Sequence, residues 1–129
     1  MKKIIALLSV IFFASAILVF AAEDTKPELR PAQKIMQARV AWLTAMNKNL
    51  GAKYFGAVAK DADDLAVQTK KVGDNIQNPL GRELTLAISS LAKDISAAAA
   101  KQDGDTVKVK LGEIKGKCGE CHVKIRDKK

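Results

Sequence analysis

The chain has 129 residues, a formal net charge of +8 at pH 7, and only 5% aromatic residues. No basic patch is interleaved with aromatic side chains, so the composition does not point to a nucleic-acid-binding protein. The positive charge would steer acidic protein partners or anionic membranes toward the surface, and it equally suits an ordinary solvated, lysine-rich surface.

The N-terminus has the pattern of a secretory signal peptide. A basic start at residues 1–3 precedes an apolar run over residues 4–20, and Val-Phe-Ala at residues 19–21 has the form of a cleavage site. We therefore expect residues 1–21 to be removed and residues 22–129 to form one mature domain in the periplasm. The alternative is an uncleaved anchor that keeps the protein at the membrane, because the run approaches the roughly 20 residues of a span.

Four segments of the mature part carry apolar residues at helical spacing. The expected helices cover approximately residues 31–50, 53–72, 79–102 and 105–127. Gly51 is the expected C-terminal cap of the first helix, Asn78 and Pro79 are expected to start the third, and Asp103 or Asp105 to cap the fourth. No segment alternates with a period of two, so a sheet is not expected. Short links between helices of similar length favour an all-α, up-down-up-down antiparallel four-helix bundle.

Cysteine and histidine occur only in the segment Cys118-Gly119-Glu120-Cys121-His122. C-x-x-C-H is the attachment signature of c-type haem, in which both thiols bond to the porphyrin and the imidazole becomes an axial iron ligand. We therefore expect one covalent haem c on Cys118 and Cys121, with His122 on the iron. A redox dithiol would need a βαβ setting, and zinc would need further ligands that the chain does not have.

The helical spacing places this haem inside the bundle. Cys118 and Cys121 fall on the apolar stripe of the last helix, and His122 lies on nearly the same face. His122 is about five residues from the end of that helix, and Met36 is about five residues from the start of the antiparallel first helix. Met36 is thus the leading candidate for the second axial ligand, since a thioether is a good iron ligand.

The alternatives for the second ligand remain open at this point. Met36 can also be plain core filler, as methionine at helical spacing usually is, and the iron would then bind a lysine, water or nothing. Met46 is a poor rival because it lies roughly 15 Å further along the helix. The expected inward stripe of the first helix is Met36, Val40, Leu43 and Leu50. The expected pocket wall is Leu65, Thr69, Val72, Leu80 and Leu84.

With these features the mature chain resembles the class II c-type cytochromes, the cytochrome c′ group and its low-spin, methionine-ligated relatives. The resemblance rests on the C-x-x-C-H near the C-terminus of the fourth helix and on residues 32–36, which look like the segment carrying the distal residue. It implies proximal ligation by His122 and a haem-edge or propionate role for Arg126. The chain departs from the family pattern at Ile125, where an aromatic residue is common, and at Ala32, where an arginine is common.

The function expected from these residues is single-electron transfer between redox proteins by a periplasmic, non-enzymatic cytochrome that cycles between Fe(II) and Fe(III). The alternative is a five-coordinate haem protein that binds NO or CO, with Met36 packed away from the iron. A peroxidase is disfavoured, since the single histidine leaves no distal His–Arg pair.

Three surface features bear on partners and packing. The lysines around the haem-bearing end form either a docking rim for an acidic redox partner or a solvated surface. A second apolar flank on the first helix, made of Ile35, Trp42 and Met46, indicates either internal packing or a homodimer contact. The row Gly112, Gly116 and Gly119 suggests a close approach by the haem or by another helix.

Overall fold

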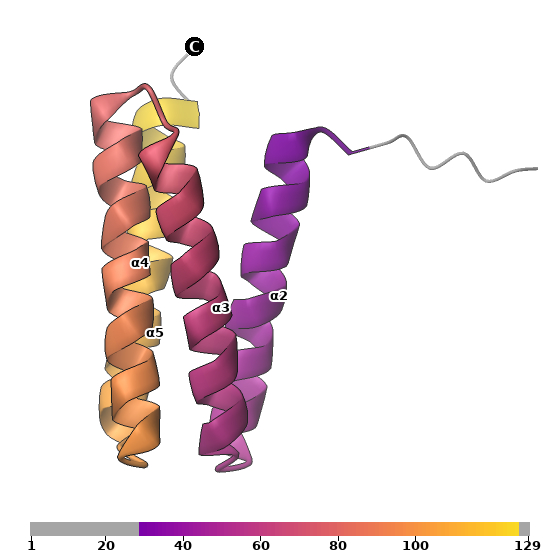
Figure 1. Ribbon diagram of the computed structural model, residues 1–129, viewed down its shortest axis with the longest axis vertical. Helices are drawn as coiled ribbons and strands as arrows, with labels where there is room; N and C mark the ends of the chain where they lie inside the picture. The colour runs from indigo at the N-terminus through magenta and orange to yellow at the C-terminus, as the bar shows by residue number, and fades with distance from the viewer. Residues whose placement is uncertain (1–28, 127–129) are drawn as a thin grey trace, which may run out of the picture. The chain divides into compact units, whose positions relative to one another are not determined.

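The computed structural model describes residues 29–126, and the expected signal peptide at residues 1–21 lies outside them. The described elements are α2 (Pro31–Gly51), α3 (Phe55–Asp74), α4 (Pro79–Ala100), α5 (Gly104–Cys121) and the short π-helix η1 (His122–Arg126). No strand occurs in this part of the chain. Consecutive α-helices run in opposite directions and are joined by short loops (Figure 1). The prediction of an all-α fold of four packed helices is confirmed.

Two helix starts are capped by side chains, as the sequence predicts. The Asn78 side chain accepts a hydrogen bond of 2.9 Å from the Gly81 N–H, with Pro79 in the first helical position of α4. At the start of α5 it is Asp103, not Asp105, that accepts a hydrogen bond from the Thr106 N–H, at 3.0 Å. Because these bonds satisfy orphan backbone donors, they define where α4 and α5 begin.

Two helix ends use a left-handed residue that is not glycine. After α4, Gln102 has a φ of 56°, and the N–H groups of Gln102 and Asp103 donate to the carbonyls of Ala99 and Ala98. After α2, Lys53 has a φ of 59° and stands in the corresponding place. Gly51 is the last residue of α2 and does not have a positive φ, so the prediction that it forms the cap is wrong. Both ends are Schellman motifs, which close the last turn of a helix.

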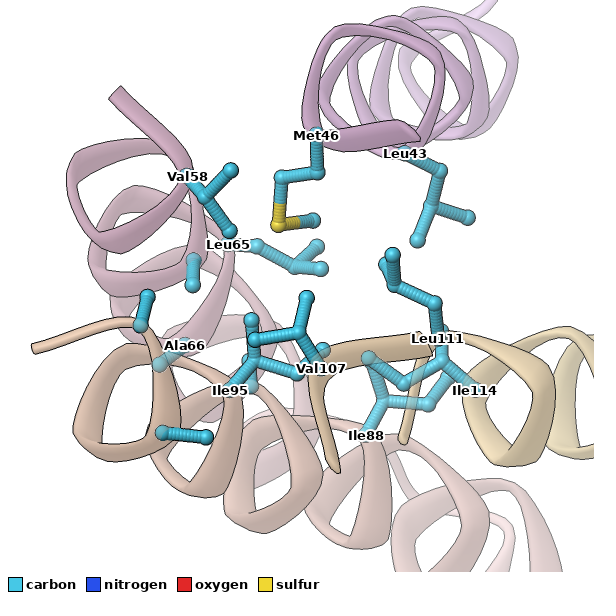
Figure 2. Close-up of a cluster of buried hydrophobic side chains, with 14 residues drawn as sticks. Leu43, Met46, Val58, Leu65, Ala66, Ile88, Ile95, Val107, Leu111 and Ile114 are labelled. Atoms are coloured by element: carbon cyan, nitrogen blue, oxygen red, sulfur yellow. The ribbon is translucent and has the colours of Figure 1, made fainter. Parts of the chain in front are cut away.

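The hydrophobic core fills one half of the bundle. It combines the second half of α2, the first half of α3, the second half of α4 and the first half of α5. Because neighbouring helices are antiparallel, all four stretches lie at the end that carries the α2–α3 and α4–α5 loops. Figure 2 shows the Met46 side chain pointing from α2 into this cluster, next to Leu65. The opposite half contains the starts of α2 and α4 and the ends of α3 and α5.

In that opposite half α2 packs only loosely. Its contacts with α3 and α5 are far less extensive than those between α3 and α4, and its first turns stand apart from α3 (Figure 1). The buried residues of α2 are Arg39, Leu43 and Met46, whereas Val40 is 62% exposed. The predicted stripe holds only in part: Leu43 is buried, whereas Met36 and Val40 are exposed and Arg39 is buried in their place. Within the described residues no helix is long and apolar enough to cross a membrane.

Candidate haem-binding site

A cavity of about 180 Å³ lies between α2, α4 and α5 in the loosely packed half of the bundle. Apolar side chains make most of its wall, and α3 contributes none of it. The lining residues are Met36, Arg39, Val40 and Leu43 from α2, Leu84, Thr85 and Ile88 from α4, Lys115, Cys118 and Cys121 from α5, and His122. The cavity thus gathers all three residues of the C-x-x-C-H motif.

The local structure of α5 turns the motif toward this cavity. Cys118 and Cys121 are one helical turn apart, and the backbone N–H of His122 donates to the carbonyls of Cys118 and Gly119. From His122 the helix continues as η1, a π-helical turn of the kind often found at functional sites. Cys118, Cys121 and His122 are half-buried, and neither cysteine is in a disulfide.

Ion pairs on the outer side hold the motif segment in helical form. Glu120 accepts from Lys124 at 2.6 Å and pairs with Lys117 at 3.5 Å. The hydrogen bond from Lys124 lowers the pKa of the Glu120 carboxyl below its ordinary value. These contacts link the last turn of α5 to η1, so that they support the backbone on either side of both cysteines.

Met36 lies at the cavity, as the sequence predicts, but it is more exposed to solvent than expected. It lines the same cavity as His122 and is 39% exposed, whereas Met46 is fully buried in the distant core. Of the second apolar flank, Met46 belongs to this core and Trp42 packs against it. Arg126 is exposed in η1 and is not among the residues that line the cavity.

The structure changes the expected pocket wall. Of the five residues named from the sequence, only Leu84 lines the cavity. Leu65 and Thr69 are fully buried on α3, which contributes no residue to the cavity wall. The sequence predicted that all four helices contribute to the wall around the haem. In the structure α2 packs loosely, and the cavity lies between α2, α4 and α5 only. No other described helix approaches the glycine row of α5 closely, since a Cβ added at Gly112, Gly116 or Gly119 would meet nothing within 4 Å among the described residues.

Arg39 lines the cavity but was not predicted from the sequence. It is only 6% exposed, and its Nε donates to the Gln68 Oε1 at 3.2 Å. Among the described residues its Nη2 is a buried side-chain nitrogen with no hydrogen-bond partner. Burial lowers the pKa of Arg39, and burial raises the pKa of the Cys118 thiol, an effect that the Arg39 charge opposes. The signal available in the sequence was its spacing, four residues before Leu43 and seven before Met46.

Three observations test whether these residues fit a haem. Two thiols and an imidazole line one cavity, which is the donor set that covalent attachment and iron ligation require. Val40 and Met36 are exposed apolar side chains at the same cavity, and a porphyrin face would cover them. The unpaired nitrogen of Arg39 suits an anionic group, and a haem carries two carboxylates. The residues present therefore fit the group.

Other comparisons add no alternative. In the part of the chain that is described, no three His, Cys, Asp or Glu side chains are grouped to hold a bare metal ion. Comparisons with protein-family models, with curated proteins and with solved structures found no match.

Proposed function

We propose that this protein is a monohaem c-type cytochrome, similar to the class II group, that carries single electrons between redox proteins outside the cytoplasm. The observation that carries the proposal is the single cavity shared by Cys118, Cys121, His122 and Met36. Cys118 and Cys121 would hold the porphyrin, His122 would ligate the iron on one side, and Met36 on the other. The group itself supplies a one-electron couple between Fe(II) and Fe(III).

The chain's own residues set the environment of that couple. The wall from α2 and α4 is mostly apolar, and burial together with ligand identity tunes a haem potential. None of the lining residues is a carboxylate, and the chain's only histidine is the proposed iron ligand. The two thiols and the imidazole of the wall support the proposal of a bound redox centre.

The distribution of charge supports an acidic partner. α2 carries Lys34, Arg39 and Lys48 and no acidic residue. α5 and η1 together contain six basic and three acidic residues. The basic ones are Lys108, Lys110, Lys115, Lys117, Lys124 and Arg126, and the acidic ones are Asp105, Glu113 and Glu120.

The other two helices carry no such excess. α3 contains four acidic and three basic residues. The acidic ones are Asp61, Asp63, Asp64 and Asp74, and the basic ones are Lys60, Lys70 and Lys71. In α4 the charges balance, with Arg82 and Lys93 against Glu83 and Asp94. The excess positive charge thus lies on α2, α5 and η1, which also line the cavity, and it would orient an acidic redox protein toward the haem edge.

One observation favours a second candidate, a five-coordinate protein that binds NO or CO. Met36 lies on the loosely packed part of α2 and is partly exposed, so a small shift of α2 would move its thioether away from the cavity. An open iron position would then admit a diatomic gas.

Optical spectra of the purified secreted protein test the proposal. We expect a low-spin spectrum, with the methionine-to-iron charge-transfer band in the oxidised form and no change of the reduced form under carbon monoxide. A high-spin spectrum that shifts on addition of carbon monoxide would instead establish the gas-binding candidate and refute the electron carrier.

A further inference from the structure

The buried charge of Arg39 has no anionic partner among the described residues. A guanidinium stays charged in proteins, and burying it without an anionic partner is unfavourable. Its Nε is held by Gln68, a neutral side chain of α3, while its Nη2 has no partner among the described residues. The hydrogen bond from Nε restrains the guanidinium, and Arg39 is one of the residues that line the cavity.

No protein carboxylate lines the cavity beside Arg39. The wall contains no Asp or Glu, and α2 has no acidic residue along its whole length. The other basic residue of the wall, Lys115, is exposed, so water can solvate its charge. Arg39 is therefore the position where an incoming anion would gain most, since a charge-assisted pair in a buried site is stronger than one in water.

We propose that Arg39 holds a carboxylate inside this cavity, and that the carboxylate is a propionate of the haem. The inference rests on the haem of the proposed function but not on electron transfer or on ligation by Met36. A guanidinium matches a carboxylate through two parallel N–H···O bonds, which a lysine ammonium cannot reproduce. A small carboxylate from solvent, such as formate, offers the same chemistry and is the competing source.

In this role Arg39 is a positioning residue. It would neutralise one propionate inside the bundle and fix the rotation of the porphyrin relative to α2. It would also tie α2, by the Gln68 bond, to both α3 and the haem, in the half of the bundle where α2 packs loosely.

Nuclear magnetic resonance on the haem-loaded, full mature chain tests the assignment. The haem carboxyl carbons are labelled with ¹³C by growth on carboxyl-labelled 5-aminolaevulinate, and the arginines are labelled with ¹⁵N. We expect one arginine to show separate, slowly exchanging Nη protons. We also expect one of the two haem carboxylate signals to move in Arg39→Met, and Arg39→Lys to restore its position only in part.

The matched control is Arg82→Met, which removes an exposed guanidinium from α4 and should leave both carboxylate signals unchanged. Carboxylate signals that are identical in wild type, Arg39→Met and Arg39→Lys would overturn the proposal. So would Nη signals that sharpen only when formate is added, because the occupant would then come from solvent. If Arg39→Met does not fold, the wild type and Arg39→Lys still decide the question. Complete absence of haem carboxylate signals would refute the haem itself, a different outcome from a wrong role for Arg39.

Discussion

The two methionines of α2 show what a single position decides. Met46 is fully buried in the distant core, whereas Met36 is 39% exposed and lines the cavity that holds His122. Counting residues from the helix ends separated them correctly, because helix rise is regular and α2 and α5 are antiparallel. The same counting could not predict how far α2 leans from its neighbours, since that depends on packing over the whole helix.

Replacement of Met36 by alanine tests the distal ligand. Met36→Ala should remove the methionine-to-iron charge-transfer band and turn the low-spin spectrum into a high-spin one, since alanine has no donor atom. Haem content should not change, because Cys118 and Cys121 are untouched. Absorption spectra of the oxidised protein report both quantities.

The control for this variant is Met46→Leu, which removes the other thioether of α2. A volume-conserving swap in the core costs less than about 1.5 kcal/mol, so the protein should fold and keep its band. A low-spin spectrum that survives in Met36→Ala would exclude Met36 as the ligand.

Arg39 marks the limit of sequence reasoning at this scale. A charged residue is assigned to the surface by default, because arginine is almost never fully buried unless it is paired. The apolar stem of an arginine can nevertheless occupy a buried face. Its spacing to Leu43 and Met46 fits that face, but only the structure shows that the guanidinium is enclosed too.

At the scale of elements, helix positions were predictable and helix faces only in part. The predicted and observed starts agree within about two residues, because apolar spacing and the caps at Asn78 and Asp103 define them. The burial of α2 was predicted only in part: Val40 and Arg39 both line the cavity, but Arg39 is buried and Val40 is exposed. The Schellman motifs were not predicted, because glycine normally occupies their left-handed position and here Lys53 and Gln102 do.

Gln102 provides a stability test at the α4–α5 connection. A left-handed backbone costs a non-glycine residue roughly 1–2 kcal/mol, and glycine avoids that cost while losing more entropy on folding. Gln102→Gly should therefore raise the free energy of unfolding by about 0.5–1 kcal/mol. Urea denaturation followed by circular dichroism measures the change.

The companion variant Ala100→Gly places the same residue two positions earlier, at the last residue of α4. There glycine should lower the free energy of unfolding by up to about 1 kcal/mol. If Gln102→Gly lowered stability as Ala100→Gly does, the left-handed conformation at residue 102 would be wrong.

At the scale of the whole molecule, the tightly packed helices are nearly neutral and the excess positive charge lies on the other two helices. The tightly packed pair α3 and α4 is nearly neutral, whereas α2 and α5 carry the excess of basic residues and the cavity between them. The net positive charge was evident from the composition. The structure adds that α2 and α5, which carry the excess, both line the cavity, together with the charge-balanced α4.

Charge reversal tests the docking surface. The double variant Lys115→Glu with Lys124→Glu changes exposed residues of α5 and η1 next to the motif, and Lys71→Glu with Lys93→Glu makes the same net change on α3 and α4. We expect only the α5 and η1 variant to slow electron exchange with an acidic redox protein, by roughly tenfold or more at low ionic strength. Added salt should remove the difference, because screening weakens steering. Equal slowing in both variants would show that net charge matters and location does not.

Covalent attachment of one haem to Cys118 and Cys121 is the central proposal for this protein. The decisive measurement is the intact mass of the secreted protein, after expression in a host that matures c-type cytochromes, together with thiol titration. We expect the polypeptide mass increased by one haem and no reactive thiol. A colourless product with the mass of the bare polypeptide and two titratable thiols would contradict the account.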